Sequence, residues 1–200
     1  TEEEISDLVQ YASQRMVTII PEIQMPGHAM SFLSSFPQYA CTSNEGPFKP
    51  SCFWETNDDC VLCVGNDGLI KRIEEILDEI IRIFSINTQN KKNLPSAFIH
   101  IGANDASRKK WKTCDRCSER MHENGLSSVD QLQSWFISHI GEFLAERNVR
   151  IVGCDNIIDS KGYEHFDLPK SALVISWRSN GGAMSAAENG HQVVMSPNDV

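Results

Sequence analysis

The sequence predicts an α/β protein of repeated parallel β/α units, and within that class a (β/α)8 TIM barrel, present as a partial barrel of about five β/α units. Amphipathic helices alternate with short, nearly continuous apolar strands, as expected for strands covered on both faces. Polar side chains follow the carboxyl ends of these strands, where a barrel places its site. No phosphate-binding glycine motif follows a strand, which disfavours an open nucleotide-binding sheet.

The chain is expected to open with a helix and a strand. Thr1 and Glu4 form a capping-box pattern, followed by apolar residues that share one helical face: Ile5, Leu8, Val9, Ala12 and Met16. The β-branched run 17–20 ends at Pro21 and predicts the first buried strand. A polar loop is expected over 22–28.

The same alternation then repeats along the chain. Apolar residues at helical spacing over 70–84 predict a second helix, and Ser128 with Gln131 predicts the start of a third that runs to Leu144. A shorter helix is expected over 182–189. The remaining apolar runs predict strands over 97–101, 150–153, 173–177 and 192–195. A complete barrel usually needs about 250 residues, so these 200 residues are expected to be an internal piece of a longer chain.

Residues 29–68 are predicted to form a long loop insertion. The segment is too long for an ordinary strand-to-helix connection and holds four of the seven cysteines and three prolines. Such a loop either forms a wall of a site or is a solvated insertion without a role, and its length alone does not separate the two.

Charge and hydropathy exclude several classes of partner. Eighteen Lys and Arg stand against 27 Asp and Glu, a formal charge of −9, without a long basic run. We therefore expect no nucleic-acid or anionic-membrane partner. The short, mostly apolar segments, such as 80–84, fall far below the roughly 18 residues of a membrane span. The acidic start, Thr1 to Glu4, resembles neither a signal peptide nor a transit peptide, so these residues do not indicate a location.

The seven cysteines leave their chemistry open. Their odd number means that at least one thiol is unpaired or joined to something outside the chain. Two C-x-x-C pairs, Cys60 with Cys63 and Cys114 with Cys117, would make a four-thiolate zinc site if the fold brings them together. Their separation exceeds that of compact zinc ribbons, so disulfides or plain thiols are preferred. No metal or cofactor is expected.

Three strand ends, residues 21–29, 98–105 and 152–157, resemble those of glycoside hydrolase family 20, the β-N-acetylhexosaminidases. Residues 174–178 and 190–197 continue the resemblance in the family's order. The match spans essentially residues 1–200 and implies that they are part of one catalytic barrel of this family. It also implies a secreted, periplasmic or lysosomal location.

The resemblance implies a substrate-assisted, retaining hydrolysis of terminal GlcNAc or GalNAc. The family's usual patterns are E-I-D-M-P-G-H, H-I-G-G-D-E and G-W-D-E, and this sequence departs from all three. By position, Asn104 replaces the Asp that polarises the substrate acetamido group, and Asp105 replaces the acid/base Glu. Gln24 replaces the Asp of the segment that contains His28. Cys154 replaces a Trp of the acetamido pocket wall.

Further site residues follow from the same resemblance. Trp177 matches the other wall of the acetamido pocket, and Asn156 replaces a Glu in the loop that contains Asp155. Asp155 is expected to contact a sugar hydroxyl, and His100 is a further candidate for substrate binding. A packing role at the mouth of the barrel remains an alternative for Glu22, His100 and Trp177.

These substitutions leave two main hypotheses. Asn104 carries no charge to oppose the oxazolinium, and a loss of this kind costs on the order of 3 kcal/mol, about a hundredfold in rate. Asp105 is one methylene shorter than Glu, roughly 1 Å of reach. His28 lacks the carboxylate partner that Gln24 replaces. The protein is therefore a hexosaminidase with impaired activity, or a non-catalytic glycan-binding or structural relative. A third possibility is an active parent altered at these positions.

The expected partner in either case is a glycan that contains N-acetylhexosamine. The sequence does not indicate whether GlcNAc or GalNAc is preferred, or the oligomeric state.

Overall fold

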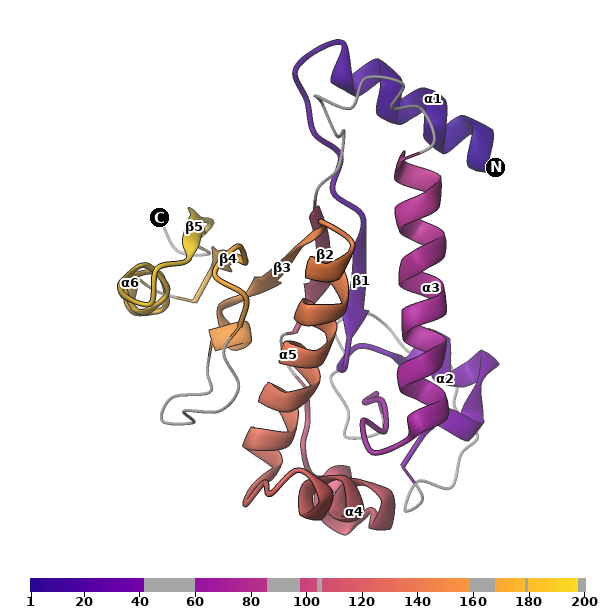
Figure 1. Ribbon diagram of the computed structural model, residues 1–200, viewed down its shortest axis with the longest axis vertical. Coiled ribbons are helices and arrows are strands. Elements are labelled where there is room, and N and C mark those ends of the chain that lie inside the picture. The colour runs from indigo at the N-terminus through magenta and orange to yellow at the C-terminus, as the bar shows by residue number, and fades with distance from the viewer. Residues whose placement is uncertain (42–59, 86–97, 104–105, 159–167, 179, 198–200) are drawn as a thin grey trace.

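The chain folds around one parallel β-sheet. In a computed structural model, which describes residues 1–41, 60–85, 98–103, 106–158, 168–178 and 180–197, five strands pair in sequence order and all run parallel (Figure 1). The strands are β1 (Glu22–Met25), β2 (Phe98–Gly102), β3 (Arg150–Cys154), β4 (Leu173–Ser176) and β5 (Gln192–Met195). This sheet confirms the prediction of parallel β/α units.

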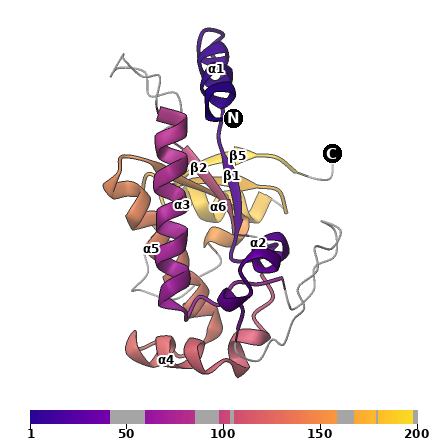
Figure 2. The same cartoon turned by 90° about the vertical axis from the view of Figure 1, so that its right-hand side faces the viewer.

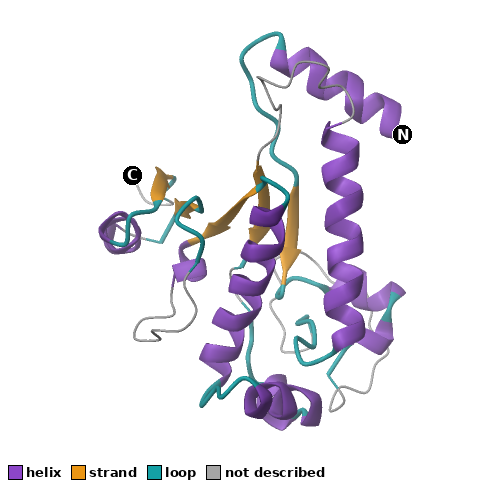
Figure 3. Cartoon of the chain, viewed as in Figure 1, coloured by secondary structure: helices purple, strands orange, loops and turns teal. Residues whose placement is uncertain are grey.

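Helices connect successive strands and cover the sheet (Figure 3). The α-helices are α1 (Glu2–Ser13), α2 (Met30–Ser35), α3 (Asp67–Ser85), α4 (Asp115–Glu123), α5 (Val129–Glu146) and α6 (Asn180–Glu188). The described residues also include the short 3-10 turns η1 (Pro37–Tyr39), η2 (Lys110–Thr113) and η3 (Asp155–Ile158). None of the described helices is both long and apolar enough to cross a bilayer.

The hydrophobic core lies between the sheet and the helices α3 and α5. These two helices run on the same side of the sheet, whereas α2 and α4 lie beyond the carboxyl end of β1 (Figure 2). Residues from α3, β2, α5 and β3 are completely or almost completely buried there: Leu77, Ile101, Leu132, Phe136, Ile140, Leu144 and Ile151. The core thus fixes the strands whose carboxyl ends would carry a site.

The two helix starts read from the sequence are confirmed. The Thr1 side chain accepts a hydrogen bond from the Glu4 amide, and the Glu4 side chain accepts one from the backbone nitrogen of Thr1. Together they form a complete capping box. Ser128 Oγ accepts the Gln131 amide at 3.2 Å. The inward face predicted for the first helix is only partly correct, because Val9 and Ala12 are buried while Leu8 is 55% exposed.

The first strand lies further along the chain than predicted. Residues 17–20 are not a strand, and Val17 is 56% exposed. The strand instead begins at Glu22, opposite His100 of β2, and the Pro21 carbonyl accepts the His100 amide at 2.9 Å. Residues 17–20 are β-branched and so favour a strand locally, but hydrogen bonding to β2 determines which residues join the sheet.

Residues 29–68 contain more regular structure than a long loop. They include α2 and η1 and the first residues of α3, while residues 42–59 lie outside the described part. The sequence also gave no signal for α4, a short and strongly polar helix between β2 and α5. Both differences fall on the connections at the carboxyl ends of β1 and β2.

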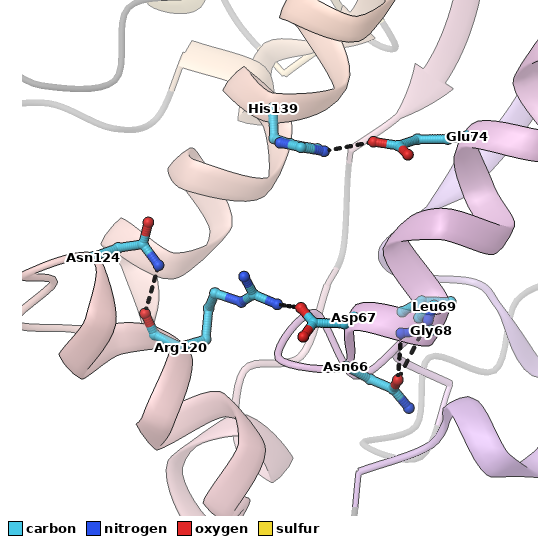
Figure 4. Close-up of polar contacts among 8 residues, drawn as sticks. All are labelled: Asn66, Asp67, Gly68, Leu69, Glu74, Arg120, Asn124 and His139. Carbon is cyan, nitrogen blue, oxygen red and sulfur yellow. Dashed lines mark hydrogen bonds and ion pairs between the residues drawn. The ribbon is translucent and has the colours of Figure 1, made fainter.

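Polar contacts fix α3 against the two helices that follow it (Figure 4). Asn66 caps α3, since its Oδ1 accepts the amides of Gly68 and Leu69 at 3.0 and 3.3 Å. Arg120 of α4 forms an ion pair with Asp67, and His139 of α5 contacts Glu74 at 2.9 Å. The ion pairs are partly exposed and contribute little energy, but they set how the helices meet.

The connection after β1 docks directly on the connection after β2. Trp111, fully buried, donates its indole N–H to the Leu62 carbonyl at 2.9 Å. At Gly65 the two backbones touch, because a Cβ there would collide with the Arg116 carbonyl group and the Cys117 nitrogen. Only glycine allows this approach without moving α4.

We predict that Gly65→Ala lowers the free energy of unfolding of the full-length protein by about 1–3 kcal/mol, because backbone atoms must shift to admit the methyl group. Chemical denaturation measures the change. Gly68→Ala is the matched control, since its Cβ would meet only side chains, the nearest at 3.2 Å. Equal stability of the two variants would contradict the prediction.

Candidate active site at the strand ends

The residues predicted to do chemistry follow four neighbouring strands at one edge of the sheet. Met25 at the end of β1 lies opposite Gly102 at the end of β2. His28 follows β1, Cys154 ends β3, and Trp177 follows β4. Parallel strands bring these ends together, as in a barrel. The structure therefore gathers the described candidates at the edge where the sequence analysis expected a site.

The two residues aligned with the family's catalytic pair, Asn104 and Asp105, lie outside the described residues. The residue before them, Ala103, directly follows the end of β2. Ala103 is buried, has a positive φ of 62°, and donates its amide to the Met25 carbonyl at 3.2 Å. The catalytic assignments of Asn104 and Asp105 stay predictions.

Glu22, Gln24 and His100 form a polar group across β1 and β2. Gln24 Nε2 donates to Glu22 Oε1 at 2.5 Å, and His100 Nδ1 lies 3.6 Å from the same oxygen. The Gly102 amide donates to His100 Nδ1 at 3.1 Å, so this nitrogen acts as an acceptor and a neutral ring carries its proton on Nε2. The amide of Gln24 is thus engaged with Glu22.

Burial lowers the pKa of His100, and the nearby Glu22 carboxylate only partly opposes this effect. His100 is 7% exposed. Gly102 leaves space for the side chain of Gln24, because a Cβ at position 102 would overlap the Gln24 amide. Its φ of +69° also favours glycine. His28 is half-buried with a φ of 52° and leads the chain away from the strand.

The Asp155 side chain binds the backbone at the start of the loop that follows β4. Its side chain is fully buried, and Oδ2 accepts the amides of Trp177 and Arg178 at 2.8 and 3.0 Å. Arg178 Nε lies 3.7 Å from the same oxygen. Burial raises the pKa of Asp155, but the Arg178 amide, the Ser176 hydroxyl and the Trp177 amide together hold that pKa below its ordinary value. The carboxylate therefore positions Trp177.

Two buried polar atoms of Trp177 and Asn156 add possible binding groups that the sequence did not indicate. Trp177 Nε1 and Asn156 Oδ1 are buried and, among the described residues, have no hydrogen-bond partner. Leaving such groups unpaired costs roughly 1–3 kcal/mol each. A donor and an acceptor of this kind suit a ligand that carries hydroxyl or amide groups. Cys154, at the end of β3, is partly exposed.

Four other cysteines could hold a metal ion. Cys41, Cys63, Cys114 and Cys117 are all buried, and their sulfur atoms lie within 4.8 Å of one another. The two C-x-x-C pairs predicted Cys60 as the fourth ligand, but the cluster contains Cys41 instead. This cluster joins the connections after β1 and β2.

Comparison with known proteins identifies one family. The chain matches the profile of "Glycosyl hydrolase family 20, catalytic domain" over residues 1–200. It is 39% identical over 197 residues to a beta-hexosaminidase of Porphyromonas gingivalis, covering 98% of this chain and 23% of that protein. A beta-hexosaminidase of Vibrio furnissii is 27% identical, with 98% of this chain and 30% of that protein covered.

Solved structures agree with this match. A beta-N-acetylhexosaminidase of Bacteroides fragilis superposes with a TM-score of 0.78 at 25% identity, covering 96% of this chain and 35% of that one. An exo beta-N-acetylglucosaminidase of Vibrio harveyi in complex with N-acetylglucosamine gives 0.78 at 27% identity, with 99% and 28% covered. These matches and the five-stranded parallel sheet confirm the predicted partial (β/α)8 barrel. The chain spans 23% and 30% of the two curated relatives.

We predict that Asp155→Asn destabilises the protein by about 1–3 kcal/mol at neutral pH, because a buried charge-assisted acceptor of two amides is lost. The unfolded carboxyl titrates near 3.8 and the folded one lower, so on acidification the unfolded state takes up the proton first. The stabilisation is therefore present above pH 3.8 and is lost as the pH falls through the folded pKa. Denaturation at a series of pH values measures it, and a pH-independent difference from the wild type would refute the assignment.

We further predict that Glu22→Gln lowers the pKa of His100 below its wild-type value, since burial then acts without the opposing carboxylate. An NMR titration of the His100 ring measures this. Glu3→Gln in α1 is a control that leaves the His100 environment unchanged. An upward shift in Glu22→Gln would contradict the predicted coupling.

Proposed function

Because the chain belongs to glycoside hydrolase family 20, we propose that the protein acts on glycans with terminal β-linked GlcNAc or GalNAc. It hydrolyses them by a substrate-assisted, retaining mechanism, at a rate reduced by its substitutions. The observation that carries the proposal is the single edge of the sheet at which His28, Cys154, Asp155 and Trp177 follow parallel strands in the family's order. The N-acetylglucosamine bound to the Vibrio harveyi relative supports the substrate class.

The proposed reaction uses the substrate's own acetamido group as nucleophile. Its carbonyl oxygen attacks the anomeric carbon while Asp105 protonates the leaving glycosidic oxygen, which gives an oxazolinium and the released aglycone. Asp105 then takes a proton from water, and the water oxygen opens the oxazolinium at the same carbon. Two inversions leave the product with the β configuration of the substrate.

The reduced rate follows from lost charge and lost reach. Asn104 accepts a hydrogen bond from the acetamido N–H but supplies no negative charge opposite the oxazolinium, a loss on the order of 3 kcal/mol. Asp105 must deliver its proton over a gap that is roughly 1 Å longer than with Glu. His28 has Gln24 in place of a carboxylate, and the Gln24 amide donates to Glu22. Each change acts on the same transition state.

Recognition of the sugar depends on the pocket wall. Asp155 binds the backbone amide of Trp177 and so holds the main chain from which the indole reaches the acetamido group. Its buried Nε1 and the buried Asn156 Oδ1 are unpaired in the described part of the chain, and they suit polar groups of the sugar. In this assignment Asp155 is a positioning residue, and a direct contact with a sugar hydroxyl is an alternative role. Cys154, at the other wall, leaves room where the family has Trp.

A second candidate is a glycan-binding relative without turnover. It is favoured by the fact that Gln24, Asn104, Asp105 and Cys154 all depart from the family's chemical residues, while the carboxylate that holds Trp177 is retained. A protein selected only for binding keeps the wall of its pocket and loses the groups that act in the transition state.

The test is hydrolysis of an aryl N-acetyl-β-glucosaminide by the full-length protein and by its Asn104→Asp, Asp105→Glu double variant. We expect slow turnover in the wild type and at least a hundredfold gain in kcat/KM in the variant, since charge and reach are both restored. The anomeric configuration of the first product is read by NMR, and an inverted product would rule out substrate assistance.

Binding of N-acetylglucosamine, measured by calorimetry, separates the two candidates. Binding without turnover in the wild type, with turnover in the double variant, supports the binding protein. If neither protein binds the sugar or turns over the substrate, both candidate functions are wrong.

A further inference from the structure

We propose that Cys41, Cys63, Cys114 and Cys117 bind a structural zinc ion as a closed four-thiolate site. This site does not depend on the proposed glycosidase chemistry. The bound zinc would link the connection that follows β1 to the connection that follows β2.

The sulfur separations are close to those of four ligands around one zinc ion. Cys63 Sγ lies 3.6 Å from Cys114 Sγ and 3.7 Å from Cys117 Sγ, and all four sulfurs lie within 4.8 Å of one another. Zinc bound to four sulfurs at about 2.3 Å separates them by about 3.8 Å. A disulfide would need about 2.05 Å. The structure thus brings four thiols to the spacing of ligands around one ion.

The four thiols are enclosed by the protein. Cys41 is 2% exposed, Cys114 is 1%, and Cys63 and Cys117 are 0%. A catalytic zinc keeps an open position for water or substrate, whereas a structural zinc is closed by four protein ligands. The burial and the complete ligand set therefore indicate a structural role.

Two of the ligands sit at the start of a helix that favours thiolates. Cys114 is the N-cap residue of the nine-residue helix α4, and Cys117 lies in its first turn. The positive end of the helix dipole and the free amides there lower the cost of a thiolate. Arg116, between these cysteines, donates from Nη2 to the Ala40 carbonyl at 2.6 Å, beside Cys41. Its cation offsets part of the charge of a zinc tetrathiolate.

The other two ligands come from a hydrogen-bonded framework. The Cys63 amide donates to the Tyr39 carbonyl at 3.0 Å, two residues before Cys41, and the Cys63 carbonyl accepts the Asn66 amide at 2.9 Å. The close backbone approach at Gly65 then places this turn on α4. Ligands from both connections are thus held in place by contacts that do not involve sulfur.

The ligand set differs from the one that the sequence spacing suggested. Cys60 is also buried, but it is not a member of the cluster, and its carbonyl accepts the Ala29 amide at 2.8 Å. The pair Cys41 and Cys60 therefore gives a matched test of the site. Zinc is assigned because thiolates select soft metals and a closed tetrahedral S4 site suits it.

The experiment measures metal in the full-length protein after purification without added metal, by plasma mass spectrometry. We expect about one zinc per chain in the wild type and in Cys60→Ser. Cys41→Ser and Cys117→Ser should each lose at least tenfold in zinc content. X-ray absorption at the zinc edge of the wild type should give four sulfur neighbours at about 2.3 Å, a result that does not depend on how the variants fold.

Several outcomes would overturn the proposal. They are iron in place of zinc, fewer than four sulfur neighbours in the wild type, or a disulfide between two of these cysteines detected by mass spectrometry. Wild-type protein that remains without zinc after incubation with zinc chloride and thiol reductant would do the same. Loss of zinc from Cys60→Ser, with zinc retained in Cys41→Ser, would show that the proposed ligand set is wrong.

Discussion

The parallel pairing of β1 with β2 is the constraint on which the rest of the structure depends. It sets Glu22 opposite His100 and Met25 opposite Gly102, so the connections after both strands leave the sheet at the same edge. These two connections must then pack on each other, which they do through Trp111 and Gly65. The polar group at Glu22, the approach to residue 104 and the cysteine cluster all follow from this arrangement.

The proposed function assigns the family fold and the family chemistry to different residues. The sheet order and the bonds of the Asp155 carboxylate to the amides after β4 belong to the fold. The proposed mechanism places the loss of chemistry at Asn104 and Asp105. Under this proposal one set of residues can change without the other.

Local patterns predicted elements whose apolar face is unambiguous. The helices α3 and α5 and the strands β2, β3 and β5 lie where periodicity placed them, within a few residues. The strand predicted over residues 17–20 was wrong because strand preference is local while strand pairing is not. Helix α4 was missed because a nine-residue segment with only two apolar positions, Cys117 and Met121, is too short to show a repeating pattern. Cys41 could not be grouped with its partners, since a ligand 22 positions before Cys63 follows no short motif. The unpaired Trp177 and Asn156 atoms depend on tertiary burial, which spacing does not report.

The cysteine cluster also bears on the order in which the chain can assemble. The contact between Cys63 and Cys114 spans 51 positions, and α3 and β2 lie between them. Pairing of β1 with β2 joins Glu22 to His100, which are further apart in the sequence. Either contact shortens the loop that the other must close, so the two closures support each other. The four cysteines are enclosed once both connections have packed, and their reactivity with thiol reagents during refolding therefore reports that packing.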